Sequence, residues 1–314
     1  MIKYHISYKH PHSRIVRFQA EFPVVSDSMT IQLPTWRPGR YEIGNFAKYL
    51  MGICYRDGDQ NTLQSVQQNN HSWELNGLNG VGTIHVEYEF HAGVLNAGSC
   101  WLDETILYLN PVNCFLYSEL LTEEPYELHF DLPDSYEIAC SMQSQGKHEL
   151  QSKNYQELMD SPLMASDQLI HWEYESNGIP FHLWFRGDHQ LDQGQVLHDF
   201  QRFTDSQIKA FGGFPVEQYH FLFLFPQVKA YHGVEHEKST VISLGPGMKM
   251  HELKQYEHFL GISSHELYHT WNVKNIRPIE MMPYDFSQPN YSVLGYVAEG
   301  VTTYLGDEFL YRSG

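Results

Sequence analysis

Two histidines, His265 and His269, stand four residues apart, and Glu266 directly follows the first. On an α-helix this spacing places both imidazoles one turn apart on a single face, where both can bind one Zn²⁺. The Glu266 carboxylate then points along the same rim, toward a water molecule beside the metal. The HExxH pattern therefore predicts metalloprotease chemistry, with the two histidines as zinc ligands and Glu266 as the general base.

The residues around this motif indicate a helix with an apolar face of its own. Residues that can pack recur at the spacing of one helical face, at Leu260, Ser264, Leu267 and Trp271. A chain with 19 histidines can contain an HExxH string by chance. Because the two histidines of the motif lie off the apolar stripe, the pattern favours a metal site on a rigid helix over two core histidines.

Glu299 is the predicted third zinc ligand. A second apolar stripe at helical spacing surrounds it, formed by Leu294, Ala298, Val301 and Leu305. Prolines between residues 277 and 290 turn the chain, so the two helices can pack against each other. Catalytic zinc usually takes three protein ligands and leaves a fourth position to water, which predicts one Zn²⁺ per chain. The alternative for Glu299 is an ordinary solvated helix carboxylate.

Two runs of the sequence, HELYHTWNVKNIRP from His265 and AEGVTTYLGD from Ala298, resemble the gluzincin metallopeptidases. The resemblance is strongest to the glycyl aminopeptidase family, M61, whose members often carry a PDZ domain. Residues 33–41 and 45–48 are similar to that family's N-terminal domain, so the resemblance spans nearly the whole chain. It implies a zinc-dependent aminopeptidase, a hydrolase that cleaves the N-terminal peptide bond after glycine or another small residue.

Residues 231–236 follow an apolar strand at 221–225 and resemble the edge-strand segment that binds the substrate amine in related aminopeptidases. An edge strand offers backbone donors and acceptors to an extended peptide, and a carboxylate at its end can pair with a free α-ammonium. We therefore expect Glu235 to be the amine anchor, with Gly233 and His236 as further substrate-binding residues. The alternatives are a loop acid paired with Lys238 and an ordinary surface histidine.

The resemblance also implies a tyrosine that supports the tetrahedral oxyanion. In the family this tyrosine comes from the helical part after the third ligand, and this chain ends at Gly314. We therefore expect a catalytic domain that is incomplete at its C-terminus, with the tyrosine beyond residue 314. Thr303 stands where an acid that orients a zinc-binding histidine is expected, and Asp307, one turn further, is its candidate replacement.

Residues 1–160 are predicted to form an N-terminal antiparallel β-sandwich domain. Apolar and polar residues alternate with period two in several segments, at 4–8, 16–22, 84–90 and 126–132, with Gly, Asn and Pro between them. No long helical pattern separates these strands, which disfavours βαβ units. The four cysteines, Cys54, Cys100, Cys114 and Cys140, lie in this part without CxxC spacing and are expected to be free thiols.

Residues 161–314 are predicted to form a thermolysin-like catalytic domain, which makes the fold class α+β. Strands are expected near 170–174, 181–185 and 219–225, with a helix over 195–211 that ends at Gly212-Gly213. The helix with the two histidines and the helix with Glu299 follow. At roughly 150 residues per domain, a length of 314 residues fits this division into two.

The composition restricts the partners. A formal net charge of −18 disfavours nucleic acid, whose phosphates would be repelled, and is compatible with cationic peptide N-termini. The N-terminus lacks an apolar signal core and no run of about 18 apolar residues occurs, so we expect a cytoplasmic protein that does not insert into membranes. The sequence leaves the oligomeric state open.

Two other functions fit the same motifs. A non-catalytic peptide-binding module would keep the fold and the metal without turnover. A zinc endopeptidase would cleave internal bonds and have no use for Glu235. A peptide substrate with a free N-terminus is expected only of the aminopeptidase.

Overall fold

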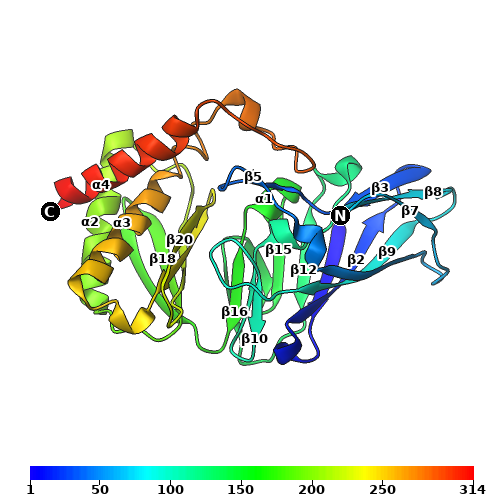
Figure 1. The fold of residues 1–314 in the computed structure, drawn as a ribbon, viewed down its shortest axis with the longest axis horizontal. Helices are drawn as coiled ribbons and strands as arrows, with labels where there is room; N and C mark the ends of the chain where they lie inside the picture. Colours follow the sequence, from blue (N-terminus) through cyan, green and yellow to red (C-terminus); the bar gives the residue numbers. More distant parts are fainter.

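A computed structural model describes residues 1–314 and shows a mixed α+β fold, in which two sheet-rich parts lie side by side (Figure 1). The largest sheet belongs to the N-terminal part and has seven strands, in the order β14 (Gln143–Gly146), β15 (Glu149–Ser152), β12 (Tyr126–Phe130), β1 (Ile2–Ser7), β2 (Ile15–Pro23), β9 (Thr83–His91) and β6 (Leu50–Arg56). Every second residue of β9 is buried, as the alternation of apolar and polar residues predicts. All neighbours are antiparallel except β1 and β12, which pair in parallel.

Three smaller sheets complete this part. They are β3-β8-β7 (Ser28–Gln32, Ser72–Asn76, Ser65–Asn69), β10-β11-β16-β13 (Trp101–Asp103, Ile106–Leu109, Leu163–Ser166, Glu137–Cys140) and β4-β5 (Trp36–Arg37, Glu42–Ile43). The short helices are η1 (Pro11–Ser13), η2 (Phe46–Tyr49), η3 (Pro111–Asn113), η4 (Glu119–Leu121) and α1 (Tyr155–Met159). The sheets share one large hydrophobic core that is rich in aromatic side chains, among them Tyr4, Phe18 and Trp36. All four cysteines are unpaired, as predicted.

The second part is built on a five-stranded sheet, in the order β17 (Ile170–Ser176), β18 (Ile179–Arg186), β19 (Tyr219–Leu224), β21 (Ser239–Gly245) and β20 (Ala230–Glu235). The three middle strands are parallel, and β17 and β20 are antiparallel edge strands. The helices α2 (Gln193–Phe211), α3 (Leu253–Tyr268) and α4 (Thr302–Ser313) lie together beside this sheet (Figure 1). Phenylalanines from both layers, including Phe185, Phe200 and Phe259, form the core between the sheet and the helices.

Local chemistry sets the ends of α2. The Asp192 side chain accepts a hydrogen bond from the backbone N–H of Gln195, which satisfies a free donor at the helix start. The helix ends at Gly212, whose positive φ of 77° favours glycine. The predicted helix at 195–211 is thus present, and it begins two residues earlier than expected.

The helix α3 carries the HExxH motif and packs closely on α4. The Ser264 hydroxyl donates to the backbone oxygen of Gly306 at 2.8 Å, and Gln207 of α2 donates to Ser264. A Cβ at Gly306 would lie 3.1 Å from the His265 Cα, so this glycine permits the close approach. Ser264 therefore joins three helices at the base of the motif.

Glu299 lies on a π-helix, η7 (Tyr296–Val301), which runs directly into α4. The predicted helix exists, but its first turn is wider than the α-helical spacing assumed from the sequence. A π-turn changes the direction in which a side chain leaves the helix, and such turns often occur at functional sites. The segment before it contains the 3-10 helix η6 (Ile279–Met281), and η5 (Gly247–Lys249) precedes α3.

The other face of the five-stranded sheet packs against the four-stranded sheet of the N-terminal part. Leu222, Leu224 and Val241 meet Tyr108 and Met164 in a small apolar cluster. The two parts thus share a continuous packed interface, and the proposed domain division at residue 160 stays a prediction. None of the helices combines the length and the apolar character needed to cross a membrane.

Candidate active site

The structure brings the three predicted zinc ligands together. The Nε2 atoms of His265 and His269 are 3.0 Å apart, and each lies 3.6 Å from Oε2 of Glu299. Ligands bound to one tetrahedral ion at about 2.0–2.2 Å are separated by roughly 3.3–3.6 Å. The three donor atoms therefore already stand at nearly the spacing that one zinc ion requires.

The orientation of His269 follows from its position at the end of α3. Its Nδ1–H donates to the backbone oxygen of Asn272 at 2.7 Å, so the lone pair of Nε2 faces His265 and Glu299. The Asn272 side chain donates in turn to the Val297 oxygen and to the Thr302 hydroxyl, both at 2.9 Å. Asn272, three residues after the motif, thus fixes the tautomer of His269 and attaches the end of α3 to the turn that carries Glu299.

The charges at this site favour a cation. Burial lowers the pKa of His269, but the carboxylates of Glu235, Glu299 and Glu266 outweigh it and raise the pKa to about 9. Burial raises the pKa of Glu299, but the imidazoles of His265 and His269, each 3.6 Å from its Oε2, hold it well below its usual value. Three carboxylates beside two imidazoles form a site whose charge is complementary to a divalent ion.

Glu266 is buried beside the two histidines. It is 5% exposed, and its Oε2 has no hydrogen-bond partner. Burial, with smaller contributions from Glu235 and Glu299, raises its pKa to about 8 although His269 opposes the shift. A carboxylate with a free oxygen and a pKa near neutrality suits a general base.

Gly233 makes room for Glu266. A Cβ built on Gly233 would lie 1.9 Å from Glu266 Oε1, so no larger residue fits while the carboxylate keeps its position. Gly233 lies on β20, the edge strand that contacts α3. The structure thus gives a steric reason for a glycine at position 233. The predicted contact of Gly233 with substrate stays a prediction.

Glu235 is at the end of β20 and is 3% exposed. One oxygen of Glu235, one of Glu266 and a ring nitrogen of His269 all lie within 4.8 Å of one another. Glu235 Oε1 has no hydrogen-bond partner, and Lys238, the partner expected for an ordinary loop acid, instead binds Glu157 at 2.7 Å. A buried carboxylate with an unpartnered oxygen next to the zinc-ligand set is a candidate site for a ligand's positive charge.

His236 points to a different partner. Its Nδ1 lies 2.9 Å from Asp160 Oδ1, and the residue is 5% exposed. It is therefore buried and not the surface histidine considered above. Its predicted role in substrate binding stays a prediction. Thr303 and Asp307 are both exposed, and neither forms a hydrogen bond with His265 in the structure.

Comparison with known families identifies the chain. Residues 3–167 match the family model of the peptidase M61 N-terminal domain, and residues 258–314 match that of the M61 glycyl aminopeptidases. The chain belongs to the M61 peptidase family. No curated protein matches it.

One solved structure supports the α+β fold predicted for this M61 family member. An aminopeptidase N family protein from Idiomarina loihiensis superposes with a TM-score of 0.92 at 27% identity, and the match covers 100% of this chain and 55% of that chain. The chain thus spans about half the length of that relative. Two M1 zinc metallopeptidase structures from Deinococcus radiodurans are more distant. One is bound to a Tyr-Ser-Ala substrate and has a TM-score of 0.49 at 12% identity, over 87% of this chain and 63% of that chain. The other has a TM-score of 0.48 at 8% identity, over 99% of this chain and 86% of that chain.

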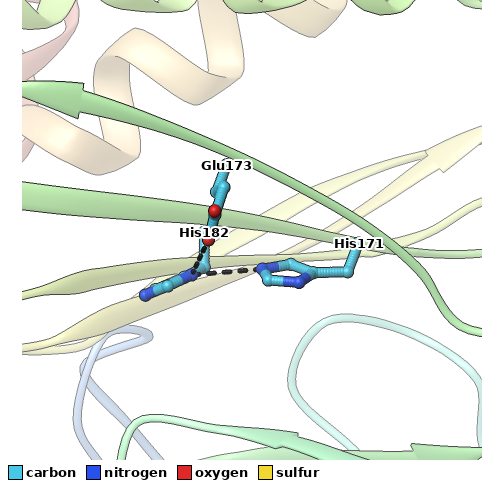
Figure 2. A group of neighbouring side chains, drawn as sticks. All are labelled: His171, Glu173 and His182. Atoms are coloured by element: carbon cyan, nitrogen blue, oxygen red, sulfur yellow. Dashed lines mark hydrogen bonds and ion pairs between the residues drawn. The ribbon is translucent and has the colours of Figure 1, made fainter.

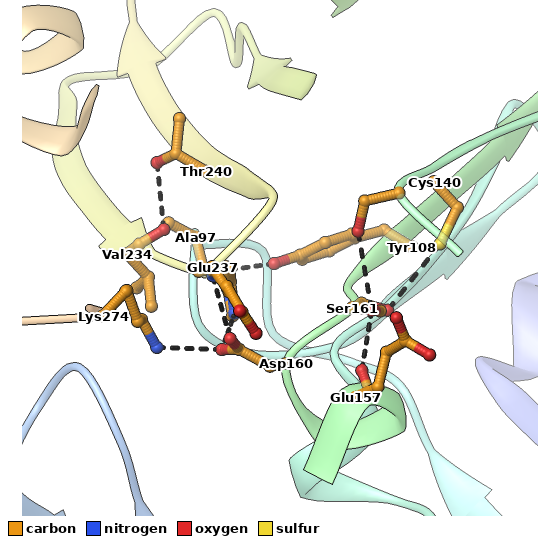
Figure 3. Close-up of polar contacts among 12 residues, drawn as sticks. Ala97, Tyr108, Cys140, Glu157, Asp160, Ser161, Val234, Glu237, Thr240 and Lys274 are labelled. Carbon is orange, nitrogen blue, oxygen red and sulfur yellow. Dashed lines mark hydrogen bonds and ion pairs between the residues drawn. The ribbon is translucent and has the colours of Figure 1, made fainter. Parts of the chain in front are cut away.

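Sequence reasoning missed a buried charge network behind the site. Asp160 Oδ1 lies 2.9 Å from Lys274 Nζ, and Asp160 Oδ2 accepts the backbone N–H of Glu237 at 2.8 Å (Figure 3). Burial raises the pKa of Asp160, but Lys274 and His236 hold it well below its usual value. Asp160 therefore joins the end of β20 to the loop after α3. No local signal marks this pair, because the two charges are 114 positions apart.

Residues 33–41 of the N-terminal part also reach the site. Gly39 has a φ of +82°, and a Cβ there would lie 2.8 Å from Glu235 Oε2. The Arg40 guanidinium is 2.9 Å from Nε2 of His232 on β20. The Tyr41 hydroxyl is buried without a partner, and burial together with Glu235 and Glu299 raises its pKa. The sequence marked this segment only through family resemblance, and the structure places it over the end of β20.

Proposed function

We propose that this chain carries the zinc-binding and amine-binding centre of an aminopeptidase. The observation that carries the proposal is the convergence of His265, His269 and Glu299 beside a buried Glu266 with an unpartnered oxygen. Two imidazoles, which are neutral once they bind the ion, and one carboxylate are a ligand set that suits zinc, and the distances between their donor atoms fit one ion. A bound zinc ion supplies a Lewis acid that polarises the scissile carbonyl.

Glu266 is the residue that moves the proton. Its Oε2 has no partner within the protein and is available to accept a proton from the attacking water. The same carboxyl then delivers the proton to the leaving amine. Burial favours the first step, because it raises the pKa of Glu266 to about 8 and so stabilises the protonated carboxyl that forms.

Glu235 determines which peptide bond is cleaved. Its buried, unpaired Oε1 is the proposed partner of the substrate α-ammonium. In a peptide, the amino nitrogen is only roughly 2.5 Å from the carbonyl carbon of the same residue. Because oxygens of Glu235 and Glu266 lie within 4.8 Å of each other, an amine held by Glu235 leaves room for the first peptide bond at Glu266. Together with the M61 resemblance, this supports cleavage after an N-terminal glycine or another small residue.

The test compares peptides with free and acetylated N-termini. We expect zinc-dependent cleavage that stops with a chelator and falls steeply when the amine is acetylated, because acetylation leaves Glu235 buried and unpaired. Glu235→Ala is expected to lower the rate on the free peptide and to reduce the preference for it. Equal wild-type rates on both peptides would contradict the amine-binding role and favour an endopeptidase. Zinc and peptide binding without turnover would favour a non-catalytic binding module.

A further inference from the structure

A second group of two imidazoles and one carboxylate lies outside the candidate active site. His171 and Glu173 belong to β17, and His182 belongs to the neighbouring strand β18 (Figure 2). Nε2 of His171 is 3.1 Å from Nδ1 of His182, and this Nδ1 is 3.8 Å from Oε2 of Glu173. The three donor atoms all lie within 4.8 Å of one another.

Strand register brings these three side chains to one face of the sheet. Glu173 pairs with His182, and His171 pairs with Trp184, while alternate residues of a strand share a face. The opposite face carries Phe181 and other core residues under the helices. The group therefore lies on the face of the sheet that is turned away from α3 and from the HExxH motif.

We propose that His171, Glu173 and His182 bind a second divalent transition-metal ion of the zinc and copper class. Two ligands at about 2.0–2.1 Å from one ion are separated by roughly 2.9–3.4 Å, depending on the coordination angle, and the observed N···N distance of 3.1 Å lies in this range. The Glu173 side chain is 70% exposed and can close the remaining distance by rotation. Imidazole and carboxylate ligands disfavour calcium and magnesium, which prefer oxygen ligands alone.

Neighbouring rings hold the imidazoles in place. The His171 ring stacks on Trp184, with centroids 3.8 Å apart and planes 8° from parallel. His220 lies against His182 with centroids 4.6 Å apart, and its Nδ1 accepts a hydrogen bond from Trp184. Nε2 of the buried His220 has no hydrogen-bond partner, so the cluster contains a polar atom that the protein does not satisfy. The imidazoles are thus preorganised by packing, which lowers the cost of binding an ion.

The expected consequence of metal binding is structural. The strand β17 is at the edge of the five-stranded sheet, and the ion would join it to β18. Since the ion would bind the folded chain and not the separated strands, it would stabilise the folded state in proportion to its concentration and affinity. No further carboxylate comparable to the buried Glu266 belongs to this group, so we assign it no catalytic step.

The experiment removes the first site and titrates the second. In a His265→Ala/His269→Ala background, ZnCl₂ is titrated into the full chain by calorimetry, with thermal unfolding measured with and without zinc. We expect one zinc ion per chain and a rise in Tm. Adding His171→Ala or His182→Ala should weaken this binding by about 100-fold or more, since changes outside the ligand shell already cost about 10–100-fold. The zinc-dependent Tm rise should disappear as well.

His85→Ala in the same background is the matched control. His85 lies 3.7 Å from Glu21 on paired strands, an imidazole and carboxylate pair that lacks the second imidazole, so its loss should leave zinc binding unchanged. Anomalous scattering at the zinc edge should show a peak between His171 and His182. The proposal is overturned if the His265→Ala/His269→Ala protein binds no zinc. It is also overturned if adding His171→Ala or His182→Ala leaves the zinc affinity of that protein unchanged. Because the background lacks both HExxH histidines, the result is independent of the proposed peptidase function.

Discussion

Two groups in this molecule have the same side-chain chemistry, two histidines and one glutamate, in different settings. The HExxH group lies between α3 and the π-helix η7, and its His269 side chain is 2% exposed. The sheet group lies across β17 and β18, and its Glu173 side chain is 70% exposed. Both place donor atoms at spacings suited to a metal ion. The same ligand chemistry is therefore assembled in two ways, between two helices and across two paired strands.

The surroundings of the two groups differ in what they add. Beside the HExxH group, Glu266 and Glu235 are buried with unpartnered oxygens, and Asn272 fixes the His269 tautomer. Beside the sheet group, the neighbours are the stacked Trp184 and the buried His220. The candidate active site therefore differs from the sheet group by the buried carboxylates of Glu266 and Glu235, which stand beside its ligand set.

The largest effect is expected from Glu266→Gln. Zinc should remain bound, because none of the proposed ligands changes, while kcat/KM should fall by about 10²–10⁴-fold as the acid–base group is lost. Peptide cleavage and zinc content are measured on the same preparation. His269→Ala is the contrasting variant and should lose zinc from this site. Near-normal cleavage by Glu266→Gln would contradict the catalytic role of Glu266, which is the main difference between the HExxH group and the sheet group.

A second effect concerns the support of the HExxH group. Asp160→Asn leaves Lys274 buried without its counter-charge and should lower the free energy of unfolding by about 3–5 kcal/mol. The double variant Asp160→Asn/Lys274→Met should recover much of this loss. Zinc binding at the sheet group should not change, since that group does not contact Asp160.

The same carboxylate predicts a pH dependence. The pKa of Asp160 in the folded chain is held below the ordinary value of 3.8 by Lys274 and His236. Its contribution to stability is therefore fully present above pH 3.8 and is lost as the pH falls through the lower folded pKa. Denaturant unfolding of wild type and Asp160→Asn is measured at several pH values. The difference between their free energies of unfolding should become smaller in acid. A difference that stays constant across this range would contradict the assignment.

A smaller effect is expected from Gly233→Ala. The added Cβ would meet Glu266 Oε1 at 1.9 Å and displace the carboxylate, which should lower kcat/KM by about tenfold to a hundredfold. Gly261→Ala in α3 is the matched control, because no atom lies within 4 Å of the added Cβ and alanine favours a helix. Equal activity of the two variants would show that the position of Glu266 is not set by β20.

The smallest effect is expected from Glu173→Gln. The Glu173 side chain is 70% exposed, so water can take its place at the ion, and zinc binding at the sheet group should weaken by about tenfold, the low end of the cost of changes beside a metal. Glu299→Gln, at the more buried group, should weaken zinc binding more strongly. Calorimetry on the two variants, each with the other group removed, gives the comparison. A larger loss from Glu173→Gln would mean that exposure does not distinguish the two carboxylates.

Much of the site could be predicted because its signals are local. The i, i+4 spacing of His265 and His269 defines a ligand pair on any helix, and the apolar stripe around them predicts that helix. The α+β class was predicted correctly, because alternation along strands such as β9 is a local property. The π-turn at Glu299 was not predicted, since apolar spacing does not distinguish it from an α-turn.

The sequence by itself determined which residues are the candidate ligands and base, namely His265, His269, Glu299 and Glu266. Only the tertiary structure decided what surrounds them: Gly39 over Glu235, and Asp160 against Lys274. It also decided that His171 and His182 meet, because their encounter depends on the register of two strands. The physical reason is that covalent spacing fixes neighbours within one helix turn, whereas burial and charge pairing across elements exist only after the chain has packed.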